Sequence, residues 1–73
     1  MTVDRAVHDI WALRRFEDEN FVTERVNKIL DQVPVEDIPE IICRLQEKNE
    51  QDPIPAINWI IDLLNVLFRA QKV

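Results

Sequence analysis

The chain contains a single residue pair of the kind that nucleophilic catalysis needs. It has one cysteine, Cys43, and one histidine, His8, and it has no serine and no tyrosine. A nucleophile works with a base within hydrogen-bond reach, but these two residues belong to different segments. Cys43 follows Ile42 on a predicted helix, where we expect a buried structural thiol. His8 lies beside Asp4 and Asp9 within another predicted helix, which indicates an exposed or lightly paired imidazole. We therefore predict that the chain is not an enzyme.

The acidic clusters are better explained by helix structure than by acid–base chemistry or metal binding. Glu36, Asp37 and Glu40 lie at the start of a predicted helix, where carboxylates interact favourably with the helix dipole. Residues 17–19 are all acidic, but they lack the alternating ligands and the glycine of a calcium loop, so we expect a solvated bend. One cysteine and one histidine do not make a structural zinc site. The sequence thus predicts no metal and no cofactor.

The composition favours an all-α intracellular protein. The 73-residue chain has no glycine, is 47% hydrophobic and carries a formal net charge of −5. Hairpin turns usually need glycine, so a β-rich fold is not expected. The negative charge argues against direct nucleic-acid binding. The N-terminus resembles no secretory signal, and no apolar run is long enough to cross a membrane. A lone free cysteine fits a reducing compartment, so we expect a cytoplasmic or nuclear location.

Hydrophobic residues recur at helical spacing in several segments. We expect an all-α fold, a small bundle or orthogonal array of three to four short helices in one domain, residues 1–73. Residues 1–28 are predicted as an N-terminal helical extension and residues 29–73 as the helical core. The acidic stretch at residues 17–20 contains no proline or glycine that forbids one continuous helix, but we favour a break there. The predicted helices cover about residues 4–18, 22–32, 38–50 and 53–71.

Polar residues at the segment boundaries are candidate helix caps. Asn20 or Thr23 is positioned to cap the second helix. Asp37-Ile38-Pro39-Glu40 has the pattern of a capping box for the third helix, with Asp37 as the cap. Asp52 is a candidate cap for the fourth helix, which can start at either of the next two prolines.

The last predicted helix is hydrophobic over most of its circumference. Within PAINWIIDLLNVLFRA, residues 55–70, the polar residues fall within an arc of about 60°. A surface helix normally has a broader polar face, and monomers avoid large exposed apolar patches. A chain this short also gains stability from a partner. We therefore expect another protein to cover part of this helix, although it could instead be the central helix of a compact bundle. The candidate partner-binding residues here are Trp59, Leu63, Val66 and Leu67.

Residues 29–61 resemble the ubiquitin-associated and CUE class of three-helix domains. Val33-Pro34 matches the hydrophobic-proline step that closes the first helix of that class, and residues 56–61, AINWII, match the pattern of its third helix. The Met-Gly-Phe loop of the ubiquitin-associated domains and the aromatic residue before proline of the CUE domains are absent. The resemblance implies a ubiquitin-binding module. It implies partner contacts at Val33, Pro34, Ile60 and Ile61.

The last helix is also similar to the second helix of the dimerisation-and-docking domains of kinase regulatory subunits. That resemblance implies a helical homodimer whose face accepts an amphipathic helix. The residues that carry it are Pro53, Ile57, Trp59, Ile61, Leu64, Leu67 and Ala70.

Three functional hypotheses follow from the sequence. The first is a non-catalytic protein–protein interaction module that forms a homodimer or a complex with a different protein through its last helix. The second is a ubiquitin-binding module. The third is a small acidic inhibitor or regulator of a basic partner, whose affinity would fall with added salt. Its contact residues would be Glu36, Asp37, Glu40, Glu47 and Glu50.

Overall fold

The computed structural model describes residues 1–72, and most of these residues are helical. Over these residues it contains four α-helices, two 3-10 turns and no strand. The all-α prediction is therefore confirmed. The helices are α1 (Val3–Ala12), α2 (Glu19–Asp31), α3 (Ile38–Gln51) and α4 (Pro55–Lys72), and the turns are η1 (Leu13–Arg15) and η2 (Val35–Asp37).

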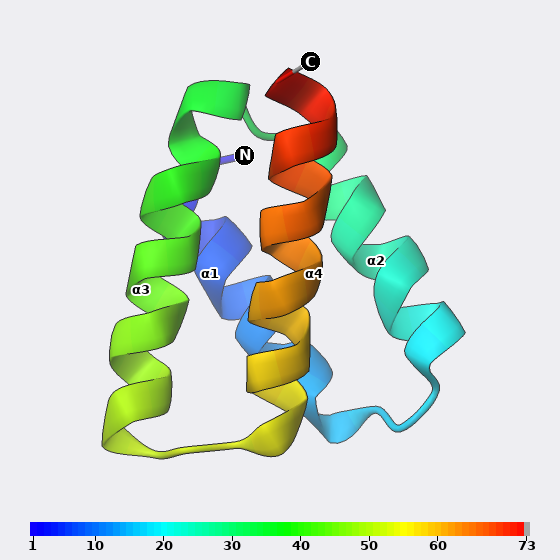
Figure 1. The fold of residues 1–73 in the computed structure, drawn as a ribbon, viewed down its shortest axis with the longest axis vertical. Helices are drawn as coiled ribbons and strands as arrows, with labels where there is room; N and C mark the ends of the chain where they lie inside the picture. Colours follow the sequence, from blue (N-terminus) through cyan, green and yellow to red (C-terminus); the bar gives the residue numbers. More distant parts are fainter. Residues whose placement is uncertain (73) are drawn as a thin grey trace.

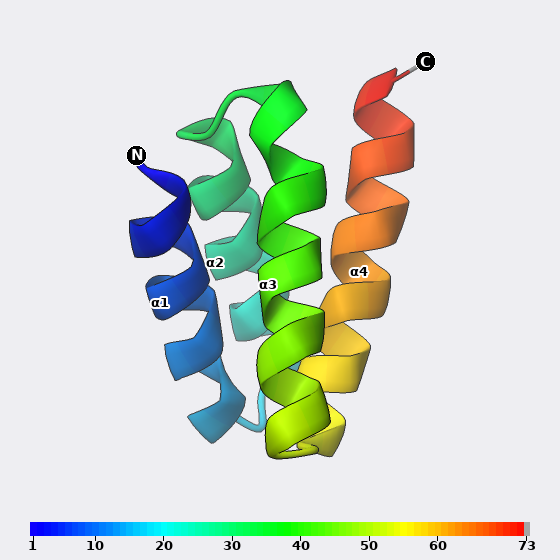
Figure 2. The ribbon, with the colours of Figure 1, turned by 90° about the vertical axis from the view of Figure 1, so that its left-hand side faces the viewer.

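Helix α3 has packed neighbours on two sides. It packs against α1 and against α4, which are the two most extensive contacts between helices. Figure 1 shows α3 and α4 running side by side, with α1 behind them and α2 on the far side of α4 from α3. Figure 2 shows α1 and α4 at opposite sides of the bundle. Helix α4 is therefore an outer helix, supported chiefly by α3, and not the central helix of the bundle.

One hydrophobic core contains residues from all four helices. Ile10, Val26, Leu45 and Ile57 are among the fully buried side chains, one from each helix. The first helices thus belong to the same core as the last two. The structure does not separate residues 1–28 as an extension from a core at residues 29–73. The buried residues are Ala6, Val7, Ile10, Leu13, Val22, Val26, Ile29, Leu30, Val33, Ile38, Ile41, Ile42, Leu45, Ile57, Ile60, Ile61 and Leu64.

The chain breaks between α1 and α2, as predicted, but the cap of α2 differs from the prediction. Asp18 is the N-cap, because its side chain accepts hydrogen bonds from the backbone N–H groups of Asn20 and Phe21 at 3.0 and 3.3 Å. Asn20 and Thr23, the predicted caps, lie inside the helix. The Thr23 hydroxyl instead donates to the Glu19 carbonyl at 2.8 Å. The acidic stretch therefore starts the helix three residues earlier than the apolar spacing indicated.

Asp37 is the N-cap residue of α3, as predicted, but the hydrogen bonds of a capping box do not form. Asp37 lies in η2 with helical backbone angles, φ −89° and ψ −14°, and its side chain makes no capping hydrogen bond. An N-cap side chain needs an extended backbone to reach the first free N–H groups. The η2 turn removes that geometry, and the backbone N–H of Asp37 donates to the Pro34 carbonyl at 2.9 Å.

The connection between α3 and α4 is held by an asparagine that the sequence did not single out. The Asn49 side chain accepts a hydrogen bond from the backbone N–H of Ile54 at 2.8 Å and donates to the Asn58 side chain. Asp52, the predicted cap of the fourth helix, is instead the C-cap of α3. Helix α4 begins at the second proline, Pro55.

Candidate protein-binding surface

Helix α4 buries one face against the rest of the bundle. Ile57, Ile60, Ile61 and Leu64 are at most 7% exposed. Residues at these spacings lie on one side of a helix. Helix α3 packs along the neighbouring side of α4, where the side chain of Asn49 donates a hydrogen bond to the side chain of Asn58.

A second apolar face of α4 is only partly covered by the bundle. Ala56, Trp59, Leu63, Val66 and Ala70 fall within an arc of about 80°, centred about 130° away from the buried face. We call these five residues the α4 stripe. Val66 is 61% exposed, the highest value among the large hydrophobic residues whose exposure the structure describes. Trp59 and Leu63 are half-buried at the edge of the core.

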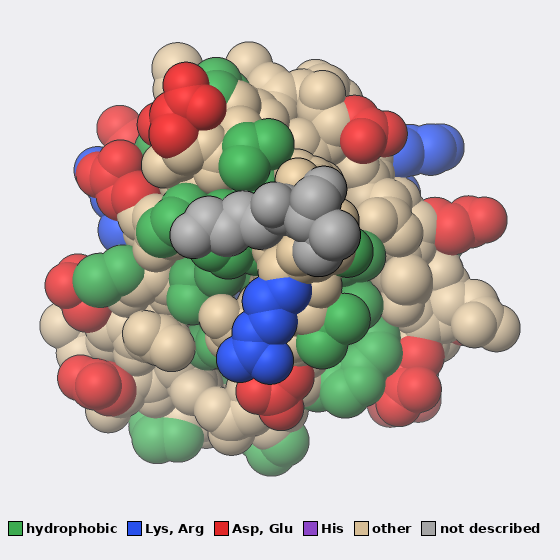
Figure 3. Space-filling model, turned by 45° about the horizontal axis from the view of Figure 1, so that its top comes forward, with side chains coloured by type: hydrophobic (Ala, Val, Ile, Leu, Met, Phe, Trp, Pro, Cys, Tyr) green, Lys and Arg blue, Asp and Glu red, His purple; other side chains and the backbone are tan. Residues whose placement is uncertain are grey.

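Of the four predicted association residues, Trp59, Leu63 and Val66 thus belong to one surface stripe. Leu67 is half-buried and borders the stripe on the side of the core. Figure 3 shows hydrophobic side chains at the surface beside the C-terminal end of α4.

The residues that the ubiquitin-associated resemblance implied as contacts do not form a surface. Val33, Ile60 and Ile61 are 6%, 1% and 7% exposed, because they pack into the core. Of the four, Pro34 alone is exposed, at the start of η2. In this conformation three of the four implied contacts are unavailable to a partner.

A groove extends the α4 stripe towards the start of α2. It has a volume of about 400 Å³ and lies between η1, the first turn of α2 and the first two turns of α4. Its walls are mostly apolar and include Leu13, Val22, Ala56 and Trp59. At its rim Phe16 is 49% exposed and packs against Phe21 with the two rings tilted by 45°, and 4.9 Å separates the ring centroids.

The acidic residues of the inhibitor hypothesis do not converge on one site. From Asp37 to Glu50 they follow α3 over about 20 Å. Glu40 is paired with Arg44 at 3.1 Å, and Arg44 also pairs with Asp4 of α1. The hydrogen bond to Asp4 is the main cause that raises the pKa of the Arg44 guanidinium, and the Glu40 carboxylate acts in the same direction. This part of α3 therefore has mixed charge.

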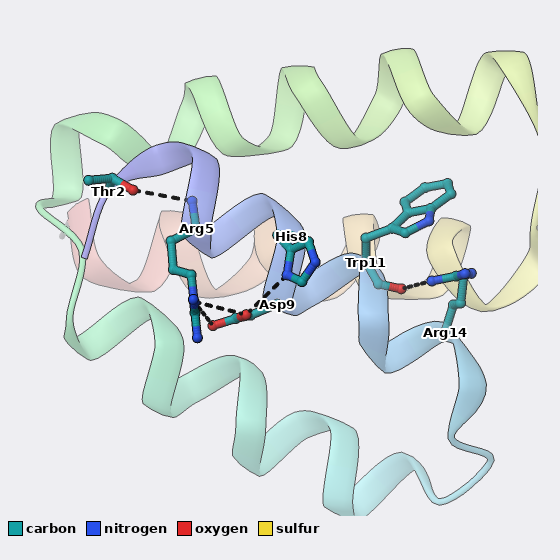
Figure 4. Close-up of polar contacts among 6 residues, drawn as sticks. All are labelled: Thr2, Arg5, His8, Asp9, Trp11 and Arg14. Carbon is teal, nitrogen blue, oxygen red and sulfur yellow. Dashed lines mark hydrogen bonds and ion pairs between the residues drawn. The ribbon is translucent and has the colours of Figure 1, made fainter.

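Trp11, the other tryptophan, lies between α1 and α3. It is half-buried, and Arg14 and Lys48 lie over its ring at 5.4 and 5.5 Å from the centroid. Arg14 also donates to the Trp11 carbonyl at 2.9 Å. Figure 4 shows Trp11 on the side of α1 that faces α3, whereas Arg5 and Asp9 point towards α2. The Trp11 ring is thus covered by cations of its own chain.

The two candidate catalytic residues lie on different helices and have weak contacts. His8 of α1 is exposed, as predicted, and its Nδ1 lies 3.5 Å from Asp9 Oδ1 (Figure 4). Cys43 of α3 is also exposed, so the predicted buried thiol is wrong. Its sulfur lies 3.9 Å from Glu47 Oε1. Among the described residues no group of histidine, cysteine and carboxylate side chains could hold a metal ion.

Comparisons with known proteins do not identify this surface, so its interpretation rests on its geometry. No protein-family model matches the chain, and neither the curated proteins nor the solved structures compared with it include a match. Over residues 1–72, none of the helices combines the length and the apolar character that crossing a membrane requires.

Proposed function

We propose that the chain is a non-catalytic protein–protein interaction module that binds its partner through the α4 stripe. The observation that carries this proposal is the position of α4. Its buried face packs mainly against α3, and a second apolar face with Trp59, Leu63 and Val66 remains at the surface. Tryptophan is enriched among the residues that dominate binding energy at interfaces. A half-buried tryptophan beside an apolar groove is a suitable anchor for a partner.

A partner that covers this surface would remove further apolar area from water. Fully burying one large aliphatic or aromatic side chain is worth about 1.5–3 kcal/mol. Trp59, Leu63 and Val66 can still gain part of this free energy when a partner binds, because each is partly in contact with water in the free chain. Phe16, at the rim of the adjoining groove, adds to the apolar area that a partner can cover.

Val66→Asp tests the proposal. Val66 is largely exposed, so the carboxylate should leave the fold intact, whereas it would be desolvated in a complex. We expect binding to weaken by about tenfold or more, equivalent to about 1.4 kcal/mol. Association is measured by light scattering over a range of concentrations and by retention of partner proteins on the immobilised chain. Ubiquitin is included in the binding measurement as a defined probe.

Val35→Asp is the matched control. Val35 is also an exposed valine, at 40%, but it lies in η2 and outside the α4 stripe. It should leave association unchanged. The proposal is wrong if Val66→Asp retains every association of the wild-type chain, or if Val35→Asp weakens association equally.

A further inference from the structure

The spacing of the α4 stripe is that of a helix that packs against another helix. Its residues are separated by three, four, three and four positions, which is the a and d spacing of a heptad repeat. Asp62 and Arg69 are both exposed and lie one heptad apart along the polar edge of the stripe. Neither forms an ion pair within the part of the chain that the structure describes. The α4 stripe is thus an apolar seam, and Asp62 and Arg69 provide one negative and one positive charge along its edge.

We propose that the partner of the α4 stripe is a second copy of this chain, with the two α4 helices antiparallel across a two-fold axis between residues 64 and 65. This inference rests on the proposed function, and it specifies the partner and the register. In this register Leu63 faces Val66 of the second copy, and Trp59 faces Ala70 of the second copy. The largest side chain of the stripe is thus opposite one of the smallest, so the seam can close without overpacking.

The positions of Asp62 and Arg69 favour the same register. Asp62 lies at the same height along the helix axis as residue 67 of the second copy. Arg69 of the second copy is two residues away from that position, which is about 3 Å along the axis. Asp62 and Arg69 of the second copy are therefore within reach of each other on the same edge of the seam. The two-fold axis repeats this pair, so that the dimer has two of them.

The alternative registers place like charges or bulky side chains together. Sliding one helix by one heptad in either direction brings Asp62 beside Asp62, or Arg69 beside Arg69, of the second copy. A parallel pair aligns Trp59 with Trp59 of the second copy and gives Asp62 no cation. Like charges at close range oppose association. The proposed arrangement pairs opposite charges and combines large with small side chains at the same time.

A charge exchange tests the register. Asp62→Arg and Arg69→Asp should each weaken the dimer, because each single variant has two like-charge contacts in place of two ion pairs. We expect the dissociation constant to rise about fivefold to thirtyfold for each single variant at low ionic strength. The double variant Asp62→Arg/Arg69→Asp should restore it to within about threefold of wild type, because both pairs form again with exchanged signs. Sedimentation velocity measures the constants, and circular dichroism verifies that each variant is folded.

The control is Glu47→Lys, which reverses a charge on α3 away from the α4 stripe and should not change the dissociation constant. A double variant as weak as the single variants overturns the register. The wild-type chain could remain monomeric at every concentration while Val66→Asp abolishes its binding to a different protein. That result would show that the partner is not a second copy, and it would leave the proposed function intact. A dimer that Val66→Asp does not weaken overturns both.

Discussion

At the scale of single residues, short polar side chains form hydrogen bonds at the starts of α2 and α4. Asp18 accepts two backbone hydrogen bonds at the start of α2, and Asn49 satisfies the N–H of Ile54 before α4. Such bonds replace those that the first residues of a helix cannot make within the helix. Asp18 is 38 positions before Ala56, the first residue of the α4 stripe, but its neighbours Glu17 and Glu19 line the groove that extends the stripe.

Asp18→Ala should destabilise the chain by about 1 kcal/mol, within the range of about 0.5–2 kcal/mol that is typical of N-cap removal. The physical reason is the loss of both hydrogen bonds to the N–H groups of Asn20 and Phe21. The free energy of unfolding is measured with urea, followed by circular dichroism. Glu17→Ala, one residue earlier and with no capping bond in the structure, is the control and should change stability by less than about 0.5 kcal/mol. Equal effects of the two substitutions would contradict the assignment of the cap.

At the scale of elements, the two apolar faces of α4 have different roles. Leu64 is fully buried, whereas Val66, two residues later, is 61% exposed. The same helix therefore contributes a core face and a surface face that alternate over short distances in sequence.

Leu64→Ala should lower the free energy of unfolding by about 2–5 kcal/mol, because it removes core contacts and leaves a cavity. Val66→Ala should change it by less than about 0.5 kcal/mol. Both variants are compared by urea unfolding at a protein concentration that keeps the chain monomeric. A large loss for Val66→Ala under these conditions would mean that the monomer covers the α4 stripe.

The number and type of the helices could be predicted from the sequence, because a spacing of 3.6 residues is a local property. The sequence could not show which apolar face of α4 is covered, because that depends on where α3 packs. Cys43 illustrates the same limit. It follows the buried Ile42, but a step of about 100° around the helix takes its side chain out to solvent. Three implied ubiquitin contacts were apolar by residue type, and their burial became visible only with the tertiary packing.

At the scale of the whole molecule, all four helices share one hydrophobic core. Its radius of gyration of 11.2 Å is close to the value of about 11 Å expected for a domain of this length. Helix α1 covers the side of α3 that α4 leaves free. Its residues Ala6, Val7 and Ile10 are all buried in that contact region of the core.

Removal of residues 1–18 should therefore abolish cooperative unfolding of the remainder. The deletion removes four buried side chains, Ala6, Val7, Ile10 and Leu13, and exposes their partners to water. Thermal denaturation followed by circular dichroism should change from a sigmoidal to a gradual transition. Arg5→Ala, on the exposed face of α1, is the control and should keep the sigmoidal transition. A deleted chain with an unchanged transition would mean that residues 19–73 are an independent domain.

No residue in the described part of the chain has a positive φ angle. Left-handed positions are the sites where natural selection usually retains glycine, since other residues are strained there. The connections of this fold therefore impose few requirements of backbone geometry on residue identity. Helical cores, in turn, tolerate many exchanges among hydrophobic residues if volume and pattern are kept. The sequence of such a protein can diverge far over evolutionary time while its backbone stays the same.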